Sequence, residues 1–363
     1  MSEPFTEGRD RSAPISQALE GLNLAPEELA NVTAALEFAL SVYPNLPSES
    51  PEKIDLLLSA LTAELEETIS RQLDTMLHAK PFMSLERAWR SLKYLVDRSE
   101  TNENIDIELL DASKSEVYND LDGAPEITNS ALFHKIYTSE YGQFGGHPFA
   151  AVVTAYELSA TPEDFALLRH MANLGVMAHL PFISSVGYSF FGLASWDELP
   201  AVEDINSIFS QPKYAAWRSI RSNENSRYLA QTLPGFQARL PYSPSVKQGA
   251  SSNRFEETEG SEKFYVWGYP SFLLALKLAE SFARYRWCVN IAGVDGGGLI
   301  DGLPKIDFKS MGKTQQRIPL QAMIGEKLEQ ELANNGLIAV SLFEGGSKAV
   351  IYSAPTALKP KTF

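Results

Sequence analysis

The clearest pattern in the chain is an apolar stripe between residues 54 and 77. Its members recur at steps of three and four residues, which predicts one long amphipathic helix. They are Ile54, Leu57, Leu58, Leu61, Leu65, Ile69, Leu73 and Leu77. Because a stripe of this length has to be covered, we expect the helix to have a partner along its whole length.

Shorter elements precede this helix. Residues 1–14 are polar and interrupted by proline and glycine, so they are predicted to be disordered. Residues 15–24 are amphipathic, which fits either a loosely docked helix or a recognition helix on a flexible tether. A helix from Pro26 to about Val42 follows, because a proline and two glutamates suit its first turn.

The pattern changes after Pro81. Helices are predicted at 85–96, 114–121 and 131–137, with a strand at 105–110, where apolar and acidic residues alternate. From Phe149 a run of β-branched and small residues predicts a buried strand, followed by a helix at 161–179 and a second buried strand at 181–186. A strand, helix, strand unit of this kind builds a parallel sheet.

The last third of the chain adds helices, a hairpin and a loop. The helices are predicted at 198–209, 213–221, 271–285 and 326–333, and a strand is predicted at 287–294. Two further strands, 337–343 and 348–353, are predicted to form a hairpin around E-G-G-S. Residues 243–263 lack periodicity and are expected to form an exposed, mobile loop.

Together these elements predict an α/β fold with a mixed sheet core flanked by helices and an N-terminal helical arm. The parallel unit and the hairpin supply the two kinds of strand pairing. The predicted organisation is a disordered tail at 1–14, a helical arm at 15–80 and an α/β core at 81–363.

Composition narrows the classes of function. The 363 residues carry a formal net charge of −15, and 44% are hydrophobic, which is enough for a sizeable core. The negative charge opposes binding to nucleic acid or to an anionic membrane. It is concentrated in residues 1–80, which hold 14 Asp and Glu against 5 Lys and Arg.

Cysteine usage and hydropathy indicate the compartment. A single cysteine, Cys288, rules out an internal disulfide and fits a reducing environment. No basic, apolar leader opens the chain, and no apolar run approaches the ~18 residues needed to span a bilayer. We therefore expect a cytoplasmic protein that does not insert into the membrane.

The candidate catalytic and metal-binding groups do not form a constellation. The five histidines (His78, His134, His147, His170 and His179) lack metal-ligand spacing, so neither a metal nor a cofactor is expected. Ser184 and Ser185 lack the G-x-S-x-G context of a hydrolase nucleophile. Cys288 stands in an apolar context typical of a buried, inert thiol. Carboxylates are common throughout this acidic chain, so Asp295 and Asp301 are not evidence for an acid/base pair.

A glycine-rich run, G-V-D-G-G-G-L-I-D-G at 293–302, superficially resembles a phosphate cradle. It lacks a following Lys-Ser/Thr pair and does not open a helix, so a turn with positive φ angles is the better interpretation. No catalytic residues are assigned, and we predict that the protein is not an enzyme. An enzyme on an α/β scaffold is the remote alternative.

Arginines and aromatics are interspersed between Trp217 and Tyr242. In this acidic chain the segment includes Arg218, Arg221, Arg227 and Arg239. An arginine fork among aromatic residues suits fixed ion pairs, phosphate recognition or a protein interface. Without a phosphate-binding companion, we interpret these arginines as ion-pair forks in the core or at a partner interface.

Six phrases in order along the chain carry a family resemblance. They are L-E-R-A-W-R-S-L-K-Y-L-V-D at 85–97, E-Y-G-Q-F-G-G-H-P-F at 140–149, the arginine segment, F-A-R-Y-R-W-C at 282–288, G-V-D-G-G-G-L-I-D-G-L-P at 293–304 and L-K-P-K at 358–361. On these phrases the chain resembles the large sheath subunit of the bacterial type VI secretion system, the TssC (also VipB or ImpC) family.

The resemblance implies a structural role in a contractile sheath. Members of the family pair with a small sheath subunit, TssB, and the pairs stack around a tube of Hcp protein. The sheath assembles on a baseplate and contracts, and the ATPase ClpV recycles it. Residues 15–24, with Ile15, Leu19 and Leu22 on one face, lie where an ATPase-recognition helix is found in some members.

Typical members continue beyond L-K-P-K into a C-terminal domain that links neighbouring pairs through shared strands, and that domain is absent from this sequence. Two roles therefore remain open: an ordinary sheath protomer, or an accessory protein that caps or regulates assembly. For either role we predict a partner interface that includes Leu61, Leu65 and Ile69 together with Arg218, Arg221 and Arg227.

Overall fold

The computed structural model describes residues 30, 33–34, 51–141, 143–242, 255, 257, 265–310, 313–343, 346 and 348–360, with only the backbone for 51–54, 57–58, 61 and the hairpin at 306–317. The predicted tail at 1–14, the segment at 15–24, nearly all of the Pro26–Val42 helix and most of the 243–263 loop lie outside the described residues. The chain divides into two compact units, residues 1–77 with 242–259, and residues 78–241 with 260–363.

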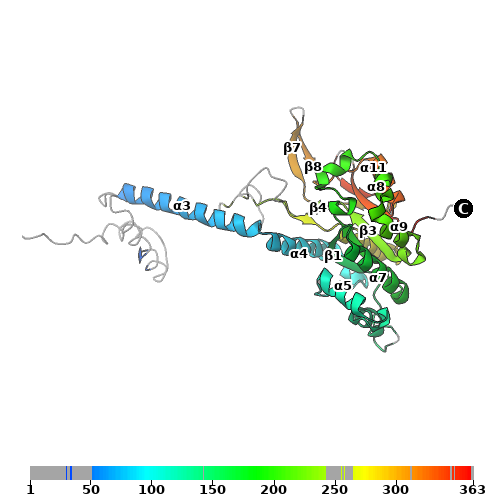
Figure 1. Ribbon diagram of the computed structural model, residues 1–363. Coiled ribbons are helices and arrows are strands. Elements are labelled where there is room, and N and C mark those ends of the chain that lie inside the picture. The colour runs from blue at the N-terminus through cyan, green and yellow to red at the C-terminus, as the bar shows by residue number, and fades with distance from the viewer. Residues whose placement is uncertain are drawn as a thin grey trace, which may run out of the picture. The chain divides into compact units, whose positions relative to one another are not determined.

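The described part of the first unit is dominated by one helix. Helix α3 (Pro51–Leu77) runs for 27 residues without interruption (Figure 1). It confirms the long helix predicted from the stripe, and it begins three residues earlier, at the last proline of the linker. Arg71 and Glu67 form an i,i+4 pair of opposite charges on this helix, which is exposed and adds little stability.

The second unit is built on a sheet of six strands in the order β1-β2-β3-β9-β10-β6. The strands are β1 (Val152–Leu158), β2 (Phe182–Val186), β3 (Leu229–Leu233), β9 (Leu337–Phe343), β10 (Lys348–Ile351) and β6 (Leu299–Ile300). The first four pair in parallel, and β10 and β6 are added antiparallel. The mixed sheet, the parallel unit and the C-terminal hairpin predicted from the sequence are therefore confirmed.

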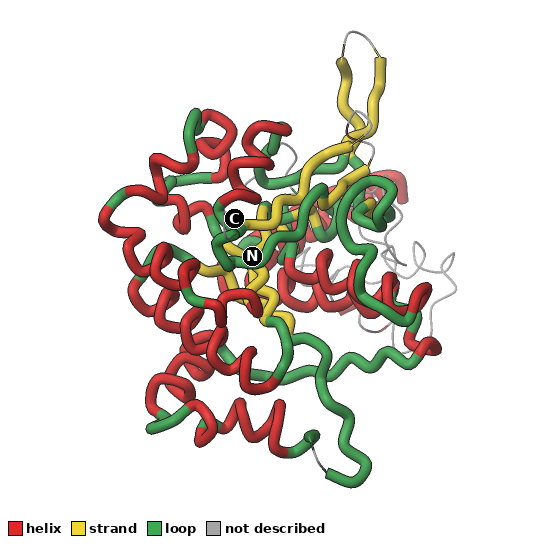
Figure 2. Tube along the Cα trace, turned by 90° about the vertical axis from the view of Figure 1, so that its right-hand side faces the viewer, coloured by secondary structure: helices red, strands yellow, loops and turns green. Residues whose placement is uncertain are grey.

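Helices connect and cover these strands. They are α4 (Lys80–Arg98), α5 (Lys114–Gly123), α6 (Ala131–Phe133), α7 (Pro162–Ala178), α8 (Ile205–Ser210), α9 (Ala215–Ser222), α10 (Ser271–Tyr285) and α11 (Glu326–Asn334). Figure 2 shows the strands running through the middle of this unit with helices on both sides. Helix α7 makes the crossover from β1 to β2, and Thr161 caps its first turn by accepting from the backbone N–H of Asp164 at 3.2 Å.

Alternation along the strands separates two hydrophobic clusters, one on each face of the sheet. In β9, Leu337 and Ala339 belong to one cluster, whereas Ile338 and Val340 belong to the other. Because successive side chains of a strand point to opposite faces, one strand serves both clusters. Helices α7 and α9 contribute to the first cluster, and α4 and α10 contribute to the second.

Two smaller ladders complete the described strands. Strand β4 (Phe236–Gln237) pairs with β5 (Trp267–Gly268), and β7 (Ile306–Ser310) pairs with β8 (Lys313–Arg317) as an antiparallel hairpin (Figure 1). These four strands, β3 and β6 were not predicted. Strand β3 lies inside the arginine segment, where its short apolar run was obscured by the flanking charges.

Two predicted strands are wrong. Residues 105–110 join no ladder among the described residues, although Ile105 and Ile107 are half-buried and the acidic residue that follows each of them is exposed. Their alternation reflects contact of one face with the protein, which does not require strand pairing. Residues 287–294 form bends, because Ser281 of α10 donates to the carbonyl of Trp287 and accepts from the N–H of Asn290.

The predicted helix at 198–209 is two elements. A 3₁₀ helix spans Trp196–Ala201, and α8 starts afresh at Ile205. The break is local: Asp204 accepts from the N–H of Asn206 at 2.8 Å and so acts as a new N-cap.

Candidate partner-binding surface

The arginine segment combines a buried aromatic core with arginines of three different environments. Trp217 is fully buried in α9 and meets Phe190 edge to face, with ring centroids 5.3 Å apart. Arg221, one helical turn further on, is also buried, whereas Arg218 and Arg227 are exposed. The sequence pattern of the segment therefore contains both core and surface positions.

Arg221 holds the C-terminal part of the chain. Its guanidinium donates to the carbonyls of Asn334 and Ala357, at 2.7 and 3.2 Å, and to the side-chain oxygen of Asn335 at 3.3 Å. Burial lowers the pKa of this guanidinium below its ordinary value. Because the acceptors are neutral, Arg221 acts as a fork between main-chain segments, and these contacts are not ion pairs with carboxylates.

Arg218 and Arg227 have different contacts. Arg218 donates to the carbonyls of Phe209 and Gln211, at 2.6 and 2.8 Å, and thereby closes the turn between α8 and α9. Arg227 lies over the ring of Tyr228, 5.3 Å from its centroid. Both side chains keep exposed surface that a partner could contact.

Arg239 makes the ion pair expected of this segment. Its Nε lies 2.6 Å from Oε1 of Glu86 in α4, and Glu86 also contacts Arg90 at 3.2 Å. This pair confirms the ion-pair interpretation for Arg239 and fastens the chain after β4 to α4.

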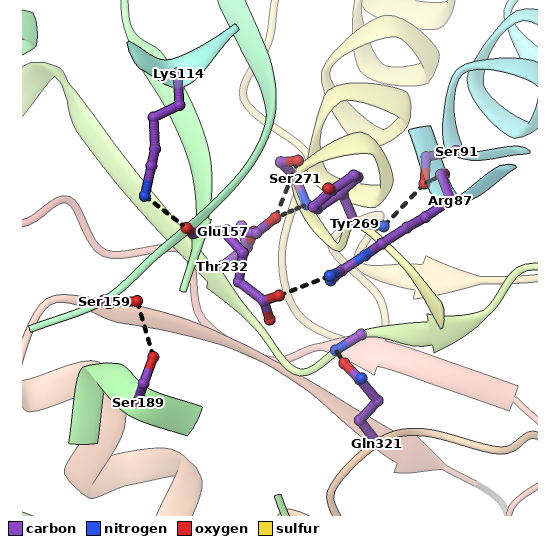
Figure 3. A network of polar contacts seen from close by, with 12 residues as sticks. Arg87, Ser91, Lys114, Glu157, Ser159, Ser189, Thr232, Tyr269, Ser271 and Gln321 are labelled. Carbon is purple, nitrogen blue, oxygen red and sulfur yellow. Dashed lines mark hydrogen bonds and ion pairs between the residues drawn. The ribbon is translucent and has the colours of Figure 1, made fainter. Parts of the chain in front are cut away.

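A second polar network ties α4 and α10 to the sheet (Figure 3). Arg87 reaches from α4 to Glu157 at the end of β1, with 2.6 Å between Nη1 and Oε2, while its guanidinium carbon lies 3.9 Å from the ring centroid of Tyr269. Ser91 accepts from the N–H of Tyr269 at 2.9 Å. Adjacent residues Glu86 and Arg87 thus anchor α4 through two ion pairs.

Ser185, one of the two serines considered as a nucleophile, belongs to this structural network, whereas the buried hydroxyl of Ser184 has no hydrogen-bond partner among the described residues. Ser185 accepts from the N–H of Ser271 at 3.2 Å and donates to its hydroxyl at 3.1 Å, and Ser271 donates to the carbonyl of Thr154 at 3.0 Å. The chain of hydrogen bonds ends on a main-chain oxygen. It therefore fixes the first turn of α10 on β1 and β2. Neither the Ser185 nor the Ser271 hydroxyl is hydrogen-bonded to a side chain that could act as a general base.

Cys288 is not buried as predicted. The residue is exposed. Its Sγ donates to the carbonyl of Leu278 at 3.7 Å, and partial burial of the thiol raises its pKa. A raised pKa lowers the thiolate fraction, which argues against a nucleophile.

The glycine-rich run forms the predicted turn. Gly293, Gly297 and Gly302 have φ angles of 79°, 88° and 73°. A Cβ on Gly298 would lie 2.3 Å from the carbonyl oxygen of Ile351, to which the turn is bonded. The glycines allow the turn to approach β10 closely and to place β6 at the sheet edge.

Neither a metal cluster nor a membrane span is found in the described ranges. No group of three or more His, Cys, Asp or Glu side chains there is arranged to hold a metal. His170 instead contacts Asp122, 3.2 Å away. None of the helices described is both long and apolar enough to cross a bilayer.

The stripe on α3 supplies the apolar surface of the first unit. Leu65 and Ile69 are 61% and 41% exposed, and Met76, seven residues after Ile69, is exposed on the same face. The side chain of Leu61 lies outside the described part, as do the predicted recognition residues Ile15, Leu19 and Leu22. Apolar side chains repeated along one helix face are typical of a surface that another protein covers.

Two further apolar surfaces were missed by the sequence reasoning. The outer face of α4 exposes Phe82, Leu85, Trp89 and Val96, and the loop before β1 exposes Phe144. On α4 a signal was present, because these residues and Leu92 recur at alternating steps of three and four. For Phe144 the signal was a phenylalanine placed before two glycines.

Two comparisons relate the chain to known proteins. Residues 59–358 match the model of the VipB family, described as EvpB/VC_A0108, tail sheath N-terminal domain. The chain is also 35% identical over 336 residues to the type VI secretion system sheath protein TssC1 of Pseudomonas aeruginosa, a match that covers 92% of this chain and 67% of that protein.

Proposed function

Because this chain belongs to the VipB/TssC family of type VI secretion sheath proteins, we propose that it pairs with the small sheath subunit, TssB, and that the pairs form a sheath around an Hcp tube. Family membership makes the chain a sheath component of the large-subunit type. We further propose that the chain meets these partners in the cytoplasm. The family is structural, and we assign no catalytic role.

The exposed stripe of α3 carries the proposal for pairing. A 27-residue helix with exposed Leu65, Ile69 and Met76 on one face has apolar surface to bury. Full burial of one such side chain contributes about 1.5–3 kcal/mol, so three of them supply a substantial part of the free energy of association. A helix or groove of TssB with matching apolar spacing is the partner that this face fits.

The exposed arginines provide a second contact. Arg218 and Arg227 retain exposed surface beside the buried Arg221, and the chain as a whole is acidic. Isolated positive groups on an acidic protein favour an acidic patch on the partner and help to fix its orientation. Arg221 contributes by keeping α9 in place.

Electron microscopy of the co-purified pair distinguishes the two roles considered for this chain. Co-expression with TssB is expected to give a complex, and assembled tubes would support an ordinary protomer. Soluble heterodimers alone would support the capping or regulatory role. Failure of the two chains to co-purify would overturn the pairing itself.

Recognition by ClpV is a separate part of the proposal. It rests on the sequence of residues 15–24, in which Ile15, Leu19 and Leu22 recur at steps of four and three. Replacing these three residues with serine should abolish binding to ClpV and leave pairing with TssB unchanged. Unaltered ClpV binding would show that the segment is not the recognition helix.

A further inference from the structure

Phe144 stands at the corner of a tight turn with its whole side chain in solvent. Its exposed fraction is 109% of the reference value. The N–H of Gly146 donates to the carbonyl of Gln143 at 3.2 Å, and Gly145 has a φ of +80°. A glycine with positive φ at the third position marks a type II turn, which places Phe144 at the second position, the corner.

A hydrogen bond across the loop and an aromatic stack before it order the turn. The carboxylate of Glu140 accepts from the N–H of His147 at 2.8 Å, so the two sides of the loop are joined. In the segment that leads into the turn, Phe133, Tyr137 and Tyr141 stack with centroid separations of 5.1 and 4.6 Å. Because these contacts already order the turn, little conformational entropy remains to be lost when the phenyl ring is buried.

The outer face of α4 presents a different kind of apolar surface in the same unit. Phe82, Leu85, Trp89, Leu92 and Val96 recur at steps of 3, 4, 3 and 4. Leu85 and Trp89 are each 57% exposed, while the neighbouring Ala88 and Leu92 are half-buried. In helix packing, four residues at i, i+3, i+4 and i+7 form the seat for one side chain of a partner. Leu85, Ala88, Trp89 and Leu92 have this spacing, with the small alanine leaving room for a large ring.

We propose that the Phe144 turn of one copy of this chain docks on the outer face of α4 in a second copy, with the phenyl ring between Leu85 and Trp89. The proposal rests on the role as a sheath subunit and adds a contact between large subunits. One surface meets a different surface on the next copy, so the contact is head-to-tail. Contacts of this kind continue from copy to copy and produce rings or helical filaments.

The net charge opposes association of two copies, so the contact has to be stabilised by apolar burial. Each chain has a net charge of −15, so two copies repel one another at long range. Salt screens that repulsion but leaves apolar burial intact. Self-association through Phe144 should therefore strengthen as salt is raised, whereas an ionic contact would weaken.

Disulfide trapping tests the contact in the complex with TssB. In a Cys288→Ser background, Gln143→Cys and Lys93→Cys place thiols beside the phenyl ring and beside the α4 seat, and leave both intact. The two variants, purified separately and then mixed, are expected to form a cross-linked dimer of this chain. Addition of Phe144→Ala should reduce its yield about tenfold or more, because the ring no longer anchors the contact.

A matched control replaces Lys93→Cys with Met177→Cys on α7, which should give no cross-link above background. Phe144→Leu, which keeps an apolar side chain on the turn, should restore part of the yield. Absence of a cross-link in the first mixture, or a yield unchanged by Phe144→Ala, would overturn the proposal.

Three other occupants of the Phe144 surface have distinct signatures. Loss of co-purification with TssB in Phe144→Ala would assign the ring to the small subunit. Phe144-dependent binding to phosphatidylcholine vesicles would assign it to a lipid surface. Cross-linking within one chain in the Gln143→Cys, Lys93→Cys double variant, with none between mixed single variants, would assign it to the chain's own α4. Each result would overturn the contact between copies, whereas wild-type failure to pair with TssB would bear only on the proposed function.

Discussion

Arg239 and Glu86 form a buried ion pair that joins the arginine segment to α4. The Nε–Oε1 distance is 2.6 Å, and the two side chains are only 4% and 9% exposed. Glu86 belongs to the L-E-R-A-W phrase and Arg239 lies more than 150 residues later, so the pair links two phrases that the sequence shows only as separate. Because this arginine is paired with a buried carboxylate, a segment rich in arginine can be part of the core of an acidic protein.

Removal of Arg239 should destabilise the second unit strongly. Arg239→Met leaves the carboxylate of Glu86 buried without its closest partner, which costs about 3 kcal/mol in the free energy of unfolding. Urea unfolding followed by circular dichroism measures this loss. Lys93→Met is the matched control, since its pair with Asp97 on the same helix is exposed and should contribute less than ~1 kcal/mol. Equal effects of the two substitutions would contradict the account.

Arg221 should be the most sensitive of the three arginines predicted to form the interface. Arg221→Lys keeps the charge but cannot reach the carbonyls of Asn334 and Ala357 together, so we expect a loss of about 2 kcal/mol in stability. Arg218→Lys and Arg227→Lys, at exposed positions, should each cost under ~1 kcal/mol. Urea unfolding curves of the three variants measure the order of their stability losses. A larger effect on pairing than on folding for Arg221→Lys would instead place that side chain at the interface.

Stability should fall at alkaline pH. Burial raises the pKa of Tyr94, Tyr156 and Tyr214 to about 12 from 10.0, and in Tyr94 nearby Arg98 partly offsets the rise. The folded protein therefore holds these protons where the unfolded chain loses them, so stability is full below pH 10.0 and declines as pH rises toward about 12. Urea midpoints across this range measure the decline. Tyr214→Phe removes one ionisation and should flatten the curve, whereas a wild-type curve that is already flat would contradict the shifts.

The sequence predicted the fold where periodicity and burial coincide. Helix α3 and the unit from β1 through α7 to β2 follow from their apolar spacing, because each buries one continuous face or run. Strand β3 was missed since it is short and flanked by charge, and its place depends on parallel partners far away in sequence. Residues 105–110 show the converse: alternation records which face contacts the protein and does not specify a strand partner.

The sequence indicated that the protein has a partner-binding surface, but it did not show which residues are exposed on that surface. Composition and the scattered phrases favoured an assembly protein, and the α3 stripe marked an apolar face. Which arginines are buried could not be inferred, because Arg218 and Arg221 differ only in the direction in which they leave α9. The exposure of Phe144 and the outer face of α4 depends on what the rest of the chain covers. That information resides in the tertiary structure.

The central claim is that α3 pairs this chain with the small sheath subunit. Its most direct test is the amount of TssB that co-purifies with the wild-type chain and with a Leu65→Asp, Ile69→Asp variant. The account predicts a stable complex for the wild type and its loss in the variant, because burying two unpaired carboxylates at the interface is prohibitively costly. Glu64→Ala, Glu67→Ala on the same helix serves as the control and should keep the complex. Undiminished TssB binding by the aspartate variant, with its fold intact, would contradict the claim.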